Sequence, residues 1–235
     1  MTHNKYYLIQ LIFILVCISI TLTHDKVFNS QLDFRVDGDG FHRTIIYHVT
    51  SEEIVNNDCY IALSLNLPSA VFVNVDEFSD VDKFGNTKVC CVGETDVELF
   101  AEAAKPQQIT ICANKSTSNE FKLTLHQRYQ RARYNEEYIN VTLSKPKLLF
   151  GCKQRIREYS VSIIDLCQPC VELALKWREI PYTTKTGNYT WIIPVGNLSH
   201  QVYVTYVTLF ITFMGMIFII KALLQSNSHE YIKDE

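Results

Sequence analysis

Hydrophobic and polar residues alternate in several short segments of this chain. The segment CYIALSLNL has an apolar residue at every second position from Cys59 to Leu67. The same alternation occurs at 70–75, 108–113, 120–126 and 137–143, and two further candidates lie at 41–50 and 188–195. A period of two is typical of strands that bury one face. The pattern therefore predicts a domain built mainly from β-strands.

Turn-forming residues separate these segments. Gly, Pro and Asn occur at 37–40 (DGDG), 67–69, 84–86, 105–106 and 145–146. Such clusters interrupt strands and favour short reversals of the chain. Helical periodicity is weak before the C-terminal apolar segment, with one candidate at 171–177 (VELALKW). We therefore expect an antiparallel β-sandwich-like domain.

Two apolar segments lie near the ends of the chain. Residues 6–22 follow Lys5 and contain only Gln10 and Ser19 as strongly polar interruptions, which predicts a signal peptide at 1–23. No A-x-A cleavage site is present, so an uncleaved anchor remains an alternative. Residues 202–220 are nineteen positions without a charge. As a helix they extend about 28 Å, close to the thickness of a bilayer core.

These segments predict a type I membrane protein with most of the chain on the luminal side. The expected parts are the signal at 1–23, a luminal β-rich domain at 24–201, a transmembrane helix at 202–220 and a cytoplasmic tail at 221–235. Four N-x-[ST] sequons fall in the luminal part and predict glycosylation at Asn114, Asn140, Asn188 and Asn197. Asn197 lies so close to the span that its modification is expected to be inefficient.

Seven of the eight cysteines lie in the luminal part, where the compartment favours disulfides. The candidates are Cys59, Cys90, Cys91, Cys112, Cys152, Cys167 and Cys170. An odd number leaves at least one cysteine free or paired with another chain, and the connectivity stays open. The CQPC segment has the spacing of a redox motif or of half a zinc site. No βαβ pattern or second ligand pair accompanies it, so we favour a local disulfide or two separate disulfides.

The segment 123–134 (LTLHQRYQRARY) interleaves basic and aromatic residues. Such a pattern can bind nucleic acid, and His126 could act as a general base. The net charge of −3 and the mixed charges argue against nucleic acid, and no nucleophile can be paired with His126 by spacing. Arg and Tyr are enriched at protein interfaces, so recognition of a partner is the preferred interpretation.

Other candidate chemistry is weak. The DGDG segment resembles the start of a calcium loop but lacks the later acidic ligand, so we interpret it as a turn. Asp76, Glu77, Asp80 and Asp82 form an acidic cluster that is most simply a solvated loop. No G-x-S-x-G, H-E-x-x-H or P-loop motif occurs, and the sequence predicts no metal and no cofactor.

The apolar C-terminal segment has small and polar residues on one side. Gln201, Thr205, Thr208, Thr212 and Gly215 are spaced by four, three, four and three residues, which places them on one helical face. Such a stripe allows another helix to approach closely. The alternative is that each Thr hydroxyl bonds to the carbonyl four residues earlier in its own helix.

An ordered set of segments resembles the PIG-X family. These segments are GFHR at 40–43, LNLPSAVFVNVDEF at 65–78, LHQRY at 125–129, VTLSKPKLLFGC at 141–152 and WIIPVGNLSHQVYVTYVT at 191–208. The family's members are accessory subunits of the endoplasmic reticulum enzyme that adds the first mannose to the GPI precursor. Cys90–Cys91 and the CQPC segment do not map onto the family pattern.

The resemblance implies a non-catalytic subunit in the endoplasmic reticulum membrane. It implies a multi-span catalytic partner of the PIG-M type, which transfers mannose from dolichyl-phosphate-mannose to glucosaminyl-phosphatidylinositol. We expect partner contacts at His42, Arg43, His126, Arg128, Tyr129, Thr205, Thr208, Thr212 and Gly215. The alternative is a cell-surface adhesion or receptor domain of immunoglobulin-like shape. Its Cys…Trp…Cys spacing is missing, because Trp177 and Trp191 follow the last luminal cysteine.

Overall fold

The computed structural model describes residues 29–51, 59–78, 87–113, 120–154, 156 and 158–230, with side chains as far as 225. The expected signal peptide lies outside these residues. The strands are β1 Ser30–Asp37, β2 His42–Ser51, β3 Cys59–Leu67, β4 Val71–Phe72, β5 Thr87–Gly93, β6 Gln107–Ala113, β7 Glu120–Gln127, β8 Tyr138–Thr142, β9 Lys147–Cys152, β10 Arg178–Glu179 and β11 Thr190–Pro194. The helices are η1 Val75–Glu77, η3 Cys170–Leu173, η4 Leu198–His200 and α4 Gln201–Glu230.

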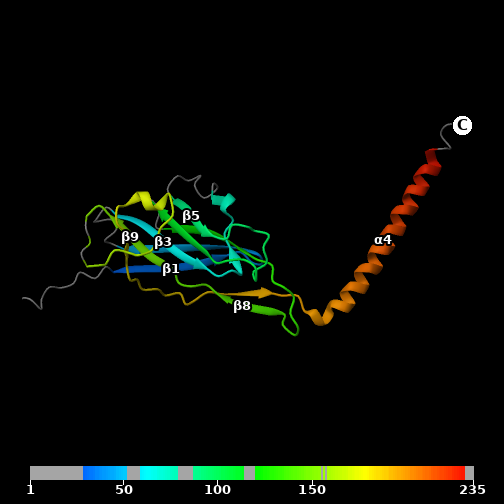
Figure 1. The fold of residues 1–235 in the computed structure, drawn as a ribbon, viewed down its shortest axis with the longest axis horizontal. Coiled ribbons are helices and arrows are strands. Elements are labelled where there is room, and N and C mark those ends of the chain that lie inside the picture. The colour runs from blue at the N-terminus through cyan, green and yellow to red at the C-terminus, as the bar shows by residue number, and fades with distance from the viewer. Residues whose placement is uncertain are drawn as a thin grey trace, which may run out of the picture.

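The strands form an antiparallel sandwich, as the alternation predicted (Figure 1). One sheet has the order β1-β2-β7-β4, and the other has the order β10-β9-β3-β6-β5. A separate two-stranded ribbon pairs β11 with β8. The DGDG segment connects the paired strands β1 and β2, which agrees with its interpretation as a turn.

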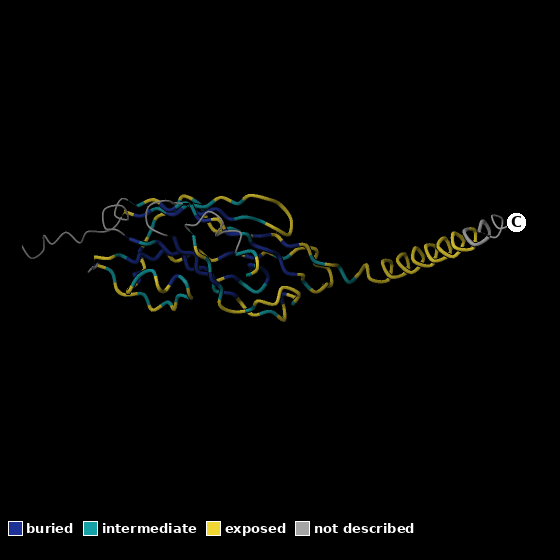
Figure 2. The backbone as a smooth tube through the Cα atoms, turned by 90° about the horizontal axis from the view of Figure 1, so that it is seen from above, coloured by how far each residue is buried: buried dark blue, intermediate teal, exposed yellow. Residues whose placement is uncertain are grey.

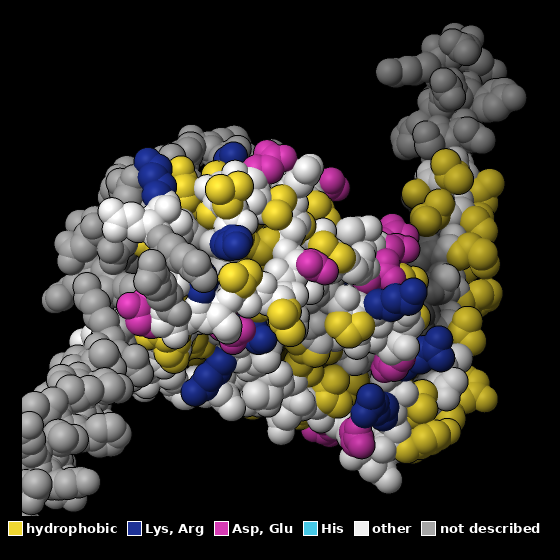
Figure 3. All heavy atoms as spheres, turned by 60° about the vertical axis from the view of Figure 1, so that its left-hand side comes forward, with side chains coloured by type: hydrophobic (Ala, Val, Ile, Leu, Met, Phe, Trp, Pro, Cys, Tyr) yellow, Lys and Arg dark blue, Asp and Glu magenta, His cyan; other side chains and the backbone are white. Residues whose placement is uncertain are grey.

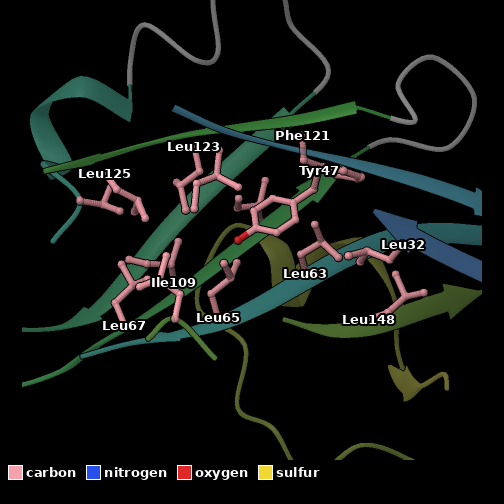
Figure 4. Packing of buried hydrophobic residues seen from close by; sticks show 14 of the residues in the cluster. Leu32, Tyr47, Leu63, Leu65, Leu67, Ile109, Phe121, Leu123, Leu125 and Leu148 are labelled. Atoms are coloured by element: carbon pink, nitrogen blue, oxygen red, sulfur yellow. The ribbon is translucent and has the colours of Figure 1, made fainter. Parts of the chain in front are cut away.

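The core lies between the two sheets and includes the apolar faces that alternation predicted for β3, β6 and β7. It also includes residues of β1 and β9, which the alternation did not predict. Figure 4 shows side chains from both sheets pointing toward one another. The first sheet contributes Leu32, Tyr47, Phe121, Leu123 and Leu125, and the second contributes Leu63, Leu65, Leu67, Ile109 and Leu148. Burial of this apolar surface is the main stabilising contribution to such a domain.

The outer face of the five-stranded sheet is also covered, which the alternation did not predict. Ala62 and Ser64 lie on the expected polar face of β3, yet both are buried. An irregular segment, residues 158–177, packs over this face and brings the Trp177 ring against Gly151, where a Cβ would lie only 3.1 Å from the ring. Gly151 therefore allows close packing of this outer layer.

Two expected elements are shorter than their patterns indicated. The helix expected at 171–177 is wrong, because only the single 3-10 turn η3 forms there. The strand expected at 70–75 ends at Phe72. The Asn74 side chain accepts a hydrogen bond from the Asp76 N–H at 3.2 Å and starts η1 instead.

The ribbon leads from the sandwich to the long C-terminal helix. Trp191 and Ile193 of β11 are fully buried against the core, whereas Ile192 faces outward. The segment Leu198–Gln225 is long and apolar enough to cross a membrane, and none of it is buried against the domain. Figure 2 shows this contrast between the buried strands and the exposed helix. The helix continues through Glu230, beyond the expected boundary at residue 220.

Candidate interaction surfaces

Arg128 lies inside the domain, although the sequence placed it on a contact surface. Its side chain is 2 % exposed. The guanidinium donates hydrogen bonds to the carbonyl oxygens of Asp96 and Leu99 and lies 4.5 Å from the Phe72 ring centroid. Burial lowers the pKa of Arg128, while the nearby carboxylates of Glu94 and Asp96 act in the opposite direction. Arg128 therefore holds the loop after β5 in place.

His126 is also largely buried and paired. Its Nε2 lies 3.0 Å from the Glu77 carboxylate, and its ring stacks on Phe72 with centroids 5.2 Å apart. The His42 ring packs edge-on against His126 at 4.5 Å. This cluster joins β2, β7, β4 and η1. His126 thus has a structural role in packing these elements together.

Arg43 connects the four-stranded sheet to the ribbon. Its guanidinium lies 4.5 Å from the centroid of the buried Trp191 ring and donates a hydrogen bond to the Tyr189 hydroxyl. Cation–π contacts of this kind are most favourable when they are desolvated. Arg43 is half-buried, so most of its contacts are internal.

The exposed part of the expected surface is smaller than the sequence indicated and includes one residue that the sequence analysis missed. Tyr129 is 70 % exposed, and its ring contacts that of Phe41, which is 47 % exposed, with centroids 5.9 Å apart. His42 is exposed beside them. We call Phe41, His42 and Tyr129 the aromatic patch. Phe41 directly follows the glycine turn between β1 and β2.

A loop after β7 is fastened to the chain that enters α4. The Arg133 N–H donates to the Gly196 carbonyl at 2.8 Å, and the Leu198 N–H donates to the Arg133 carbonyl at 2.9 Å. The Val195 N–H donates to the Glu137 carbonyl at 2.8 Å. We call residues 133–138 the junction loop. It brings the segment HQRYQRARY to the end of the domain from which α4 departs.

The small and polar stripe of helix α4 is exposed in the single chain. The hydroxyls of Thr205, Thr208 and Thr212 each donate to the carbonyl four residues earlier, at 2.7–2.8 Å. This was the alternative interpretation of the stripe, and it leaves the oxygen lone pairs available. Gly215 has open space around its Cα. Figure 3 shows hydrophobic side chains along the helix, whereas both signs of charge are dispersed over the domain face in view.

The cysteines form three long-range disulfides. They link Cys59 to Cys152, Cys90 to Cys167 and Cys112 to Cys170. The CQPC cysteines therefore belong to two separate disulfides, and the redox interpretation of this pair is wrong. Cys91 is free and half-buried, and burial raises the pKa of its thiol. A raised thiol pKa lowers the fraction of reactive thiolate at neutral pH.

Three of the four sequon asparagines lie within the described residues. Asn140 and Asn188 are exposed, on β8 and just before β11. Asn197 is half-buried, and its side-chain oxygen accepts a hydrogen bond from the Ser199 N–H at 2.9 Å. Asn114 lies outside the described residues, as do Asp80 and Asp82. Among the described residues, no group of three or more His, Cys, Asp or Glu side chains is arranged to hold a metal ion.

Together, the fold and these surfaces define a disulfide-linked antiparallel β-sandwich carried on one candidate membrane span. The sequence comparisons specify the class further. A family model described as PIG-X / PBN1 matches residues 38–224, and the chain belongs to this family.

Curated relatives carry one shared name. The human protein named "GPI alpha-1,4-mannosyltransferase I, stabilizing subunit" is 24 % identical over 75 % of this chain and 72 % of its own length. The rat protein of the same name is 25 % identical over 74 % of this chain and 73 % of its own length. No solved structure matches the chain.

Proposed function

We propose that this chain is the non-catalytic, stabilising subunit of a GPI mannosyltransferase I. The observation that carries the proposal is the extent of the family match, which includes both the sandwich and the candidate span. The named relatives align with about three quarters of the chain. In this role the chain resides in the endoplasmic reticulum membrane, with the sandwich in the lumen.

The partner that we propose is a multi-span catalytic subunit of the PIG-M type. That subunit transfers the first mannose from dolichyl-phosphate-mannose to the GPI precursor, and this chain contributes no reacting group. The internal contacts of His126 and Arg128 support this division, because both side chains are committed to holding loops in place.

Two features of the chain are suited to holding such a partner. Helix α4 offers the stripe of Thr205, Thr208, Thr212 and Gly215, along which a second helix can approach closely. The aromatic patch offers exposed Phe41 and Tyr129 at the same end of the sandwich. Aromatic side chains contribute much of the binding energy at protein interfaces. The partner would be held within the bilayer and just above it.

A paired set of helix variants tests the proposal. Thr208→Ile with Gly215→Ile adds bulk to the stripe and should prevent close packing. Phe210→Leu with Ile217→Leu changes the opposite face and serves as the matched control. In cells that depend on each variant, we expect the stripe variant to lower catalytic-subunit abundance at least fivefold, which corresponds to roughly 1 kcal/mol of lost association.

The control variant should leave that abundance unchanged. Both variants must be present in the membrane at parental levels, measured on the same blots. If the stripe variant and its control support equal amounts of catalytic subunit, α4 is not the contact that stabilises the partner. If complete loss of this chain leaves the catalytic subunit unchanged, the proposed function itself is wrong.

A further inference from the structure

The junction loop, residues 133–138, has a fixed position relative to the start of the candidate span. Its backbone is bonded to Val195, Gly196 and Leu198 by the three hydrogen bonds described above. The Ser199 hydroxyl adds a fourth contact to the Asn135 side chain at 3.3 Å. The loop therefore stays beside residues 195–199 whatever angle α4 adopts beyond them.

This attachment places the loop within the interfacial layer of a bilayer. Leu198 lies four residues before Val202, where the uncharged run begins. Four residues of helix rise about 6–8 Å, depending on whether the turns are α or 3-10. The headgroup layer on each side of the hydrocarbon core is roughly 5–7 Å thick. The Arg133 backbone, bonded to Leu198, consequently lies at headgroup level when α4 spans the membrane.

The loop carries two tyrosines that the sandwich does not cover. Tyr134 is 70 % exposed, and Tyr138 is 63 % exposed. Tyr138 pairs with Pro194 at the end of the ribbon nearest α4. An exposed tyrosine has an apolar ring and a polar tip, and this combination is enriched at membrane interfaces.

The loop has no excess of positive charge, because it contains Arg133 together with Glu136 and Glu137. Arg133 forms ion pairs with Glu136 at 3.1 Å and with Glu102 at 3.9 Å. A basic patch would bind anionic lipids by electrostatic attraction, which requires unpaired cations. A neutralised arginine does not supply that attraction. The exposed side chains that the loop offers to lipid are therefore aromatic. Their contact with headgroups does not require a particular headgroup charge.

We propose that the junction loop contacts the membrane surface, with the Tyr134 and Tyr138 side chains lying among lipid headgroups on the sandwich side of the bilayer. This contact restricts the orientation of the sandwich relative to the membrane, because the loop and the residues that enter α4 move as one unit. This inference requires that α4 spans a membrane and is independent of the identity of any protein partner.

Tryptophan fluorescence in vesicles tests whether the junction loop contacts the membrane surface. The full chain is reconstituted in phosphatidylcholine vesicles as Tyr134→Trp or Tyr138→Trp, and the emission of the parent protein is subtracted. The native Trp177 and Trp191 are buried and contribute a constant background. The matched control is Leu175→Trp, a fully exposed site that lines one pocket together with Gly151 and Cys152 of β9. Strand β9 lies at the end of the sandwich away from α4 (Figure 1).

We expect lipid with a spin-labelled headgroup to quench the added emission at positions 134 and 138 at least twofold more than at 175. Aqueous iodide should show the reverse order. Replacing a fifth of the phosphatidylcholine with phosphatidylserine should change neither result. Equal iodide quenching at all three positions would overturn the proposal, since it places the loop in water. Protection of positions 134 and 138 from both quenchers would also overturn it, since protein would then cover them.

Discussion

At the scale of single residues, the arginine at position 128 shows how a charged side chain can order a loop. It crosses from the end of β7 to two carbonyl groups of the segment 96–99, and its guanidinium packs on Phe72. Hydrogen bonds from a charged donor are stronger than neutral ones, so this one side chain stabilises a segment that forms no strand. The loop it holds lies beside Tyr129, whose backbone carbonyl accepts a hydrogen bond from Ala101.

Removal of this side chain should destabilise the domain. For Arg128→Ala we expect a loss of about 2–3 kcal/mol, because two carbonyls lose their donor and a cavity forms beside Phe72. For a domain of this size that is a decrease in Tm of roughly 4–12 °C, measured on the full chain in detergent.

The control is Arg131→Ala, because Arg131 is exposed and its recorded hydrogen bond uses only its backbone N–H. We expect a change within roughly 0.5 kcal/mol for this variant. Equal, small effects of the two substitutions would contradict the internal role of Arg128.

The internal role of Arg128 could not be predicted from the sequence. A charged residue that continues a strand's polar face is normally solvated, and only the tertiary contacts with the segment 96–99 reverse this expectation. Tyr129 was expected on a contact surface, and its side chain is exposed two residues after the end of β7. Phe41 was missed because nothing in its neighbourhood distinguishes an exposed aromatic from a buried one.

At the scale of elements, disulfides hold an irregular layer on the five-stranded sheet. Cys90 on β5 and Cys112 on β6 each reach a cysteine of the CQPC segment. Trp177 then packs over Gly151 and Leu149 to complete a second apolar cluster. Cross-links across such long separations stabilise a domain mainly by restricting its unfolded state.

The connectivity makes a direct prediction for peptide mapping. Digestion of the alkylated, non-reduced protein should yield linked peptides containing Cys59 with Cys152, Cys90 with Cys167, and Cys112 with Cys170. The half-buried Cys91 should be alkylated only after denaturation. Recovery of a Cys167–Cys170 linkage by mass spectrometry would contradict the connectivity and would reopen the redox interpretation.

The alternation predicted β3, β6 and β7, but it did not show which strands are buried on both faces. β3 alternates in sequence, yet the outer layer buries small residues on its second face. β9 has three consecutive buried apolar residues, Leu148, Leu149 and Phe150, because the outer layer covers its second face. A continuous apolar run of this length does not distinguish a strand from other buried structure. The prediction of a helix at 171–177 was also wrong. Disulfide bonds and the contacts of the Trp177 ring determine the conformation of that segment, and neither can be read from periodicity.

At the scale of the whole molecule, the two ends of the sandwich have different surroundings. The junction loop and the aromatic patch lie at the end from which α4 departs, and the Cys59–Cys152 pair lies at the other end (Figure 1). Asn140 and Asn188 are exposed on or next to the ribbon, so glycans there would occupy its outer surface. Under the proposed function, a protein partner would then contact α4 and the aromatic patch.

Recovery of the bound partner tests the central claim most directly. The tagged full chain is purified from its own membranes in a mild detergent, and the retained proteins are identified by mass spectrometry. The proposed function predicts a multi-span mannosyltransferase in near-stoichiometric amount, together with glycans on the tagged chain that stay sensitive to endoglycosidase H. Recovery of the chain without any multi-span enzyme, at the cell surface and with resistant glycans, would contradict the claim and favour the adhesion alternative.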